Sequence, residues 1–207
     1  MAVTKFELTS RTPVGNQAGF GAIGKYEFLK GVLHYAVDPK HPDSQLIADI
    51  EMVPTGNDGK VHFASDVQIL KPIDAKPGGS LLVDVVNRGN RTALVFNSPP
   101  PVPADQDPAL GNGFLMERGF TIVFCGWQTD VPDGRIKLHV GEAVDQNGHR
   151  LTGQAYQQFD LHKTSNELLL SDREHNPLPT ADLEDPTATL IERDWPDGPP
   201  TVIPREQ

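Results

Sequence analysis

Two short apolar runs, residues 81–86 and 120–124, constrain the fold of this chain more than any other feature. Their apolar residues largely follow one another instead of alternating with polar ones, which is typical of strands covered on both faces of a parallel sheet. Residues 113–119, directly before the second run, have the length and composition of a short helix. The sequence therefore predicts a β-α-β crossover whose two strands run parallel and are covered on both faces.

Polar turns follow both apolar runs. Parallel sheets place ligands and catalytic groups in the loops beyond the carboxyl ends of their strands. Asn87, Arg88 and Gly89 follow the first run, and Gly126, Trp127 and Gln128 follow the second. The sequence therefore places these six residues where chemistry is expected.

Strand-like segments precede the crossover. Residues 26–38 alternate well enough to form a long strand. Residues 47–53 and 61–70 predict a hairpin, because the Gly-Asn-Asp-Gly stretch at 56–59 tolerates the positive φ angles of a tight turn. We expect two or three antiparallel strands in this part of the chain.

Hairpin patterns also follow the crossover. Residues 136–144 and 151–161 alternate around a Gln-Asn-Gly turn at 146–148. A second pair of strand-like segments, residues 188–194 and 201–204, flanks a Pro- and Gly-rich turn. The sequence predicts a hairpin at each place.

The predicted fold class is α/β with a high β content. Antiparallel N-terminal strands and one β-α-β crossover form a partial sheet, and a β-hairpin excursion follows at the C-terminal end. Residues 1–130 are expected to form the core half, and residues 131–207 a hairpin-rich insertion or cap segment with Pro-rich loops. Residues 97–112 form a further proline-rich loop, which is expected to border a pocket.

Composition excludes several classes of function. Eighteen basic and 28 acidic residues give a formal net charge of -10, so we expect no nucleic-acid partner. No run of about 18 apolar residues is present, and no signal-peptide pattern, so the sequence predicts no membrane partner and a cytoplasmic location. Secretion of a processed form stays open. The one cysteine, Cys125, lies in an apolar run and is interpreted as a buried small hydrophobe.

Known catalytic and cofactor motifs are missing or out of context. Residues 19–24 match Gly-x-Gly-x-x-Gly, but neither a strand before them nor a helix after them supports nucleotide binding. The seven histidines lack the spacing of metal ligands. No Gly-x-Ser-x-Gly elbow is present, so a serine nucleophile is not found. We therefore expect no cofactor and no metal, and we assign no catalytic nucleophile.

The chain resembles the N-terminal part of the α/β-hydrolase domain-containing proteins, a family of longer serine-hydrolase-like chains. The resemblance rests on motifs that follow one another in order: Tyr-Glu-Phe-Leu-Lys-Gly at 26–31, Tyr-Ala-Val-Asp-Pro at 35–39, Ile-Ala-Asp at 47–49, Asn-Arg-Gly at 87–89, Gly-Phe-Leu at 113–115, Gly-Trp at 126–127, and Asp-Pro-Thr-Ala-Thr-Leu at 185–190 with Arg-Asp at 193–194. Thr129 stands where the family pattern has glycine.

The resemblance implies an esterase- or lipase-like fold and function. In that family the Asn-Arg-Gly turn follows the third core strand, so the amides near Arg88 and Gly89 become candidate oxyanion-hole donors, with strand-end packing as the alternative role. Trp127, Gln128, Asp130 and Phe96 become candidate residues of a pocket for a small-molecule ester, although core packing is the alternative for Phe96 and Trp127. The nucleophile-bearing elbow and the later acid and histidine lie in a C-terminal part that these 207 residues do not include.

Three interpretations follow. The chain is the front half of a hydrolase that needs a separate C-terminal half, or a non-catalytic β-rich module that binds a partner, or a truncated reading frame. An open sheet edge attracts further strands, so the expected partners are the C-terminal half or further copies in a homo-oligomer that pair through that edge.

Overall fold

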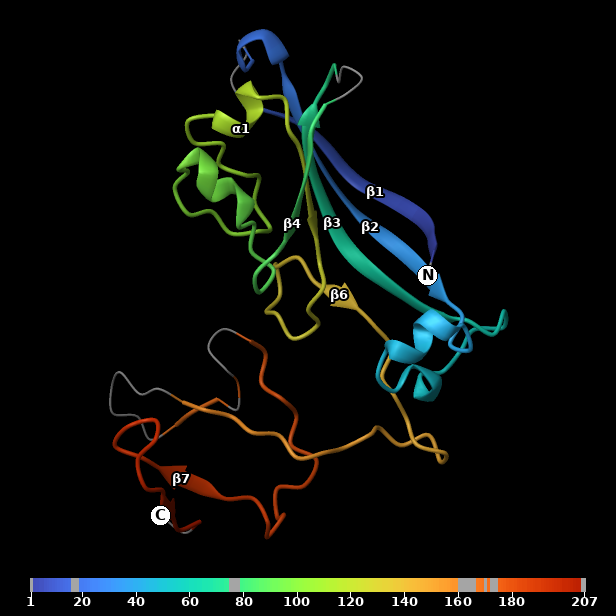
Figure 1. Cartoon of the computed structure of the whole chain (residues 1–207), viewed down its shortest axis with the longest axis vertical. Helices are drawn as coiled ribbons and strands as arrows, with labels where there is room; N and C mark the ends of the chain where they lie inside the picture. Colours follow the sequence, from blue (N-terminus) through green and yellow to red (C-terminus); the bar gives the residue numbers. More distant parts are fainter. Residues whose placement is uncertain are drawn as a thin grey trace. The chain divides into compact units, whose positions relative to one another are not determined.

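A mixed sheet of six strands lies in the first of two compact units, Met1–Pro177 and Leu178–Gln207. The computed structural model describes residues 2–15, 19–74, 79–159, 167–169, 171 and 175–205. The strands of the sheet, in chain order, are β1 (Ala2–Val14), β2 (Tyr26–Val37), β3 (Val61–Pro72), β4 (Leu81–Val85), β5 (Thr121–Cys125) and β6 (Leu138–His139). Their spatial order is β1-β2-β3-β5-β4, and β6 pairs with β3 (Figure 1). The chain is therefore β-rich, as the sequence predicts.

The β-α-β crossover is confirmed. Strand β4 pairs in parallel with β5, and Val83 lies opposite Val123. Between the two strands the chain forms the 3-10 helix η4 (Ala93–Asn97) and the one-turn helix α1 (Phe114–Glu117), which contacts η4. A parallel pair needs a long connection, and these two short helices lie within it.

The prediction that both crossover strands are covered on both faces is wrong for β4. Leu81, Val83 and Val85 expose 63%, 55% and 68% of their surface. Asp84, on the opposite face, is buried. The apolar run correctly indicated a strand, but only one of its faces is covered.

Strands β1, β2 and β3 form an antiparallel meander, which confirms the predicted N-terminal antiparallel strands. The strand predicted at 47–53 is wrong: the chain forms the 3-10 helix η3 (Ile50–Met52) there, directly after a first 3-10 helix, η2 (Pro42–Leu46), and Asp49 has φ 56°. That left-handed backbone cannot continue a strand. Strand β1 lies in a segment for which the sequence predicts no strand. Two register shifts in its pairing with β2 interrupt the alternation of apolar and polar residues that would have indicated a strand.

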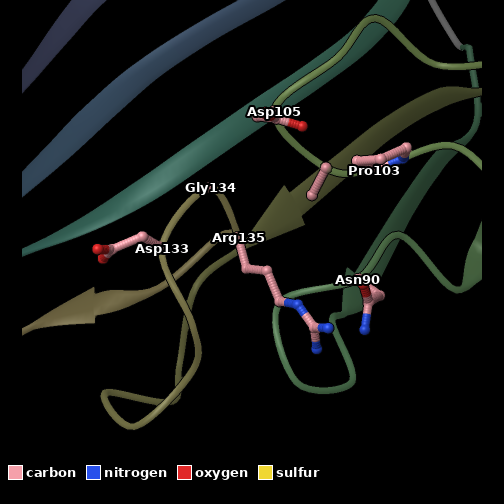
Figure 2. Close-up of a pocket in the computed structure, with 7 residues that line it drawn as sticks. Asn90, Pro103, Asp105, Asp133, Gly134 and Arg135 are labelled. Carbon is pink, nitrogen blue, oxygen red and sulfur yellow. The ribbon is translucent and has the colours of Figure 1, made fainter. Parts of the chain in front are cut away.

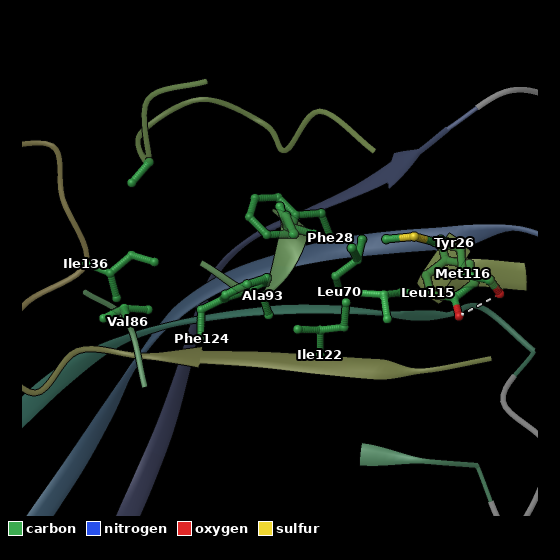
Figure 3. Packing of buried hydrophobic residues seen from close by; sticks show 12 residues of the cluster. Tyr26, Phe28, Leu70, Val86, Ala93, Leu115, Met116, Ile122, Phe124 and Ile136 are labelled. Atoms are coloured by element: carbon green, nitrogen blue, oxygen red, sulfur yellow. Dashed lines mark hydrogen bonds between the residues drawn. The ribbon is translucent and has the colours of Figure 1, made fainter. Parts of the chain in front are cut away.

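The main core lies on one face of the sheet. Side chains from β2, β3 and β5, among them Phe28, Leu70 and Phe124, pack against residues of α1 and η4 (Figure 3). Tyr26 is fully buried, and its hydroxyl donates hydrogen bonds to the carbonyl oxygens of Phe120 at 3.0 Å and Met116 at 3.2 Å. Burial raises the pKa of Tyr26 to about 12. The crossover connection is thus fixed onto this core face.

The hairpin predicted around residues 146–148 forms only in part. Val144 and Arg150 make an isolated bridge, and residues 151–159 are not a strand, while residues 160 and 161 lie outside the described residues. The final predicted hairpin is confirmed in the second unit, where β7 (Leu190–Glu192) pairs antiparallel with β8 (Thr201–Ile203). The expected division after residue 130 into a core half and a cap stays a prediction, and the compact units divide after residue 177.

Asp84 joins the end of β4 to the start of η4. Its carboxylate accepts hydrogen bonds from the Thr92 hydroxyl and the Ala93 N–H, both at 2.7 Å. Asp84→Ala leaves both donors without this acceptor, so we expect the free energy of unfolding to fall by about 2 kcal/mol or more. Urea unfolding measures this. Asp43→Ala, at a side chain that is 91% exposed, is the control and should change stability by less than about 0.5 kcal/mol. Equal effects contradict the role of Asp84.

Glu27 makes stability depend on pH. Burial raises its pKa, but hydrogen bonds and ion pairs with Arg11 and Lys71 outweigh burial and hold the pKa below its ordinary value of 4.5. A carboxyl whose folded pKa is depressed stabilises the fold above its unfolded pKa, and this contribution is lost as pH falls through the folded pKa. Glu27→Gln should therefore flatten the decline of unfolding free energy below about pH 4.5, measured by urea unfolding between pH 7 and pH 3. An unchanged pH slope contradicts this.

Candidate functional site

The turns after β4 and β5 lie side by side and are joined by side-chain hydrogen bonds. The Arg88 N–H donates to Gln128 Oε1 at 2.8 Å. The indole N–H of Trp127 donates to the Val86 carbonyl oxygen at 2.6 Å. The structure thus brings together the two turns that the sequence places at the carboxyl ends of parallel strands.

The sequence explains the conformation of the turn after β4 at Gly89 but not at Arg88. The Asn90 N–H donates to the Asn87 carbonyl oxygen at 3.0 Å, and both Arg88 (φ 51°) and Gly89 (φ 72°) adopt left-handed backbone. Two successive positive φ angles are typical of a tight type I′ turn, whose central positions favour Asn, Asp or Gly, so Arg88 occupies a conformation that its side chain disfavours. A Cβ atom at position 89 would lie 2.6 Å from the Cβ of Arg135. Glycine is therefore required both by the φ angle and by the close approach of the next loop.

The two candidate oxyanion donors differ in their surroundings. The Arg88 N–H is already bound to the Gln128 side chain. For the Gly89 N–H, no acceptor is found within the described part of the chain. The Gly89 carbonyl oxygen accepts from the Ile136 N–H at 3.2 Å, so the loop after β5 packs onto this turn. The Arg88 N–H is thus satisfied within the protein, and Gly89 is a buried residue held beneath the loop that follows β5.

The pocket expected from Trp127, Phe96 and the proline-rich loop stays a prediction. Trp127 is 53% exposed, and Phe96, on η4, is 61% exposed. A cavity of about 290 Å³ does adjoin the Asn-Arg-Gly turn, and it is lined by Asn90, Pro103, Ala104, Asp105, Asp133, Gly134 and Arg135 (Figure 2). The proline-rich loop thus borders a cavity as expected, but the residues opposite it are polar or charged. The 3-10 helix η4 buries Ala93, Leu94 and Asn97 and leaves Phe96 exposed, so Phe96 does not take the core-packing role considered for it.

Polar side chains of the sheet and of the segment after β4 hold the proline-rich loop in place. Lys30 donates to the Asp105 carbonyl oxygen at 2.7 Å, and Gln68 donates to that of Ala104 at 3.0 Å. Arg91 donates to the Pro103 carbonyl oxygen at 2.8 Å, and its guanidinium lies over the Phe28 ring, 5.6 Å from the centroid. These bonds fix one wall of the cavity. On the opposite wall the Arg135 side chain extends toward the turn, where it donates to the Arg88 carbonyl oxygen at 3.2 Å (Figure 2).

Asp130, a predicted pocket residue, pairs with a histidine that the sequence does not single out. Its Oδ2 lies 2.9 Å from Nδ1 of His175. Asn176 fixes the approach, because its N–H donates to the Asp130 carbonyl oxygen at 2.6 Å and its side chain donates to that of Val131 at 3.0 Å. The Nε2 atom of His175 is buried and has no hydrogen-bond partner among the described residues. An imidazole oriented by a carboxylate is the arrangement of a general base, but here the basic nitrogen faces the protein interior.

Other potentially reactive groups have structural surroundings. Burial raises the pKa of the Cys125 thiol, which favours its protonated, less reactive form. His62 lies 2.9 Å from Asp58, and His139 lies 2.8 Å from Asp66. Over the described ranges, no group of three or more His, Cys, Asp or Glu residues is arranged to hold a metal ion. In the same residues, no helix is long and apolar enough to cross a membrane.

Comparisons with known proteins found no match: no protein-family model, no curated protein and no solved structure is significantly similar to this chain.

The contact between the two turns can be tested directly. Gln128→Ala removes the acceptor of the Arg88 N–H, so we expect the Arg88 amide hydrogen to exchange with solvent about tenfold faster. Hydrogen exchange followed by NMR measures this rate. Gln154→Ala, at an exposed position, is the matched control and should leave the rate unchanged. An unchanged rate in Gln128→Ala contradicts the hydrogen bond.

Proposed function

We propose that this chain forms the oxyanion side of an esterase- or lipase-like α/β-hydrolase. The observation that carries the proposal is the parallel pairing of β4 with β5, which sets Arg88 and Gly89 directly beside Trp127 and Gln128. In α/β-hydrolases one oxyanion donor comes from the loop that follows the third core strand. With β2 taken as the first core strand, β4 is the third, and its following turn has the required place.

The strand order supports the same proposal. Strand β5 lies between β3 and β4, so the crossover returns the chain next to the antiparallel strands. This arrangement suits the front half of a hydrolase-like sheet, in which β4 remains available at the edge for a further parallel strand. Strand β1 is then an N-terminal addition to that sheet.

The proposed chemistry is acyl transfer to serine followed by hydrolysis. A serine outside residues 1–207 attacks the ester carbonyl, and the oxygen of the tetrahedral intermediate accepts the Gly89 N–H. Before the reaction, the Gln128 side-chain oxygen is a neutral acceptor for the Arg88 N–H. In the proposed transition state the oxyanion takes the place of this oxygen as the acceptor. A charged acceptor forms the stronger hydrogen bond, so this exchange favours the transition state over the ground state.

A non-catalytic binding module is the second candidate function. It is favoured by the exposed apolar residues of β4, because apolar surface on an edge strand is typical of protein interaction sites. In that case the Asn-Arg-Gly turn serves strand-end packing, and the Gln128 contact is structural.

Ester hydrolysis tests the first candidate against the second. The chain is assayed with p-nitrophenyl acetate and butyrate, alone and mixed with the polypeptide encoded directly downstream, provided it carries Gly-x-Ser-x-Gly. We expect turnover only in the mixture. Gly89→Ala should lower that turnover about 100-fold, because the turn that presents the amide is distorted.

Gly59→Ala is the matched control for Gly89→Ala. Gly59 has the same φ angle of 72°, but a Cβ atom there meets no atom within 4 Å. Gly59→Ala imposes comparable backbone strain in a turn far from the site, so the turnover of this variant should stay close to that of the unmodified chain. No turnover in the mixture, or equal losses in both variants, contradicts the proposed function.

A further inference from the structure

Exposed apolar residues lie on both faces of the β7–β8 hairpin in the second unit, residues 178–207. The two strands pair Leu190 with Ile203 and Ile191 with Val202. Since directly opposed residues project to the same side of a sheet, each face of the hairpin carries an apolar pair. Leu190, Ile191 and Val202 are exposed. An isolated two-stranded hairpin is only marginally stable in water, so this unit gains stability from a partner that covers it.

An exposed tryptophan lies in the loop between these two strands. The chain turns at residues 195–198, Trp-Pro-Asp-Gly, where the Gly198 N–H donates to the Trp195 carbonyl oxygen at 2.9 Å. Proline at the second position of a β-turn and glycine at the fourth favour this conformation. The Trp195 ring packs against Gly198, because a Cβ atom there would lie 3.0 Å from the ring atom Cε2. Trp195 is nevertheless 57% exposed, so the loop presents a preordered indole at the surface.

Acidic residues dominate the second unit. It carries seven acidic and two basic residues, so half of the chain's formal charge of -10 lies in 30 of its 207 residues. Glu192, Asp194 and Asp197 lie within three residues of Trp195 in the sequence. Across the described residues, none of these three carboxylates pairs with a basic side chain. The exposed indole is therefore surrounded in the sequence by negative charge that no ion pair neutralises.

Both arginines of the second unit bind backbone carbonyl oxygens. Arg193 donates to the Pro196 carbonyl oxygen at 3.3 Å, within the same loop as the tryptophan. Arg205 donates to the Asp185 carbonyl oxygen at 2.8 Å. These hydrogen bonds hold the loop and the end of the hairpin in place, and they leave the carboxylates beside the tryptophan for a cation from outside the unit.

We infer that this hairpin is a docking surface for a basic segment of another protein. Trp195 is the anchor, because an indole ring attracts an ammonium or guanidinium group over its face, and tryptophan is enriched among the residues that dominate binding energy. The carboxylates beside it attract the same cation. The aliphatic stems of lysine side chains cover apolar residues such as Ile191 and Val202. A second copy of this chain fits poorly, because it would bring two acidic units together.

The docking surface does not depend on the proposed hydrolase function. It belongs to the unit that contains neither the Asn-Arg-Gly turn nor β4. Binding to it is measured without any turnover. Failure of ester hydrolysis therefore leaves the docking surface standing, and absence of binding leaves the hydrolase proposal standing.

Titration of the full chain with a decalysine peptide, followed by NMR, tests the inference. We expect the indole N–H signal of Trp195 to shift and saturate at low salt, and the affinity to fall as salt screens the charges. The indole signal of Trp127 is the internal control and should stay in place, because that N–H donates to the Val86 carbonyl oxygen in the first unit. An unmoved Trp195 signal, equal shifts of both signals, or a Trp195 signal that moves with protein concentration alone overturns the inference.

Substitutions of the tryptophan separate its ring from its apolar bulk. Trp195→Leu keeps an apolar side chain but removes the aromatic ring, so the dissociation constant for decalysine, measured by calorimetry, should rise about fivefold or more. Trp195→Phe keeps an aromatic ring and should lose less affinity than Trp195→Leu. Unchanged binding by Trp195→Leu, or equal losses in the two variants, overturns the inference.

Substitutions of carboxylates separate this surface from the negative charge of the whole chain. Asp194→Asn combined with Asp197→Asn should raise the dissociation constant at low salt about tenfold. Asp43→Asn combined with Asp74→Asn is the matched control, because both carboxylates are exposed in the first unit and the net charge changes equally. The control should change the dissociation constant by less than about twofold. Equal weakening by the two pairs means that decalysine binds the acidic chain without preference for the hairpin, and it overturns the inference.

Discussion

The parallel pairing of β4 with β5 is the constraint on which the rest of the structure depends. It requires a long connection, and that connection covers the core face with η4 and α1. The carboxylate of Asp84 starts this connection by binding Thr92 and Ala93 as the chain leaves the strand region. The same pairing brings the two carboxyl ends together, so Arg88 reaches Gln128. Core packing and candidate site are therefore two consequences of one strand pairing.

Coverage of the face opposite the main core differs between the central strands and the edge strand β4. On that face Val67 of β3 is 1% exposed and Leu29 of β2 is 8% exposed. At one end of the same face Ile50 of η3 packs against Val37 and Val61. Leu81, Val83 and Val85 of β4 are exposed although their composition suits burial. Burying such surface stabilises by about 25 cal/mol per Å², so β4 is the strand that gains most from a further covering layer.

The sequence predicts elements better than it predicts what surrounds them. Apolar runs identified β4 and β5, because such runs are typical of strands that can be buried. The same pattern does not indicate whether another part of the chain covers the strand. Ile50 and Val53 lie three residues apart, a spacing that fits the 3-10 helix η3. Other apolar residues nearby make this spacing hard to recognise, so the sequence predicts a strand there. The contact between Asp130 and His175 joins segments 45 residues apart, and no local pattern signals such a pair. The adjacency of the two turns was predictable because parallel strands impose it.

The Arg88–Gln128 contact satisfies one of the two amides of the Asn-Arg-Gly turn within the protein. A partly buried N–H that lacks an acceptor is costly, and the neutral side-chain oxygen of Gln128 removes that cost for Arg88. The Gly89 N–H has no acceptor among the described residues, although Gly89 is buried. On the proposed function, a charged oxyanion is a stronger acceptor than the Gln128 amide oxygen and displaces it. The contact that stabilises the turn is then the same contact that the proposed reaction replaces.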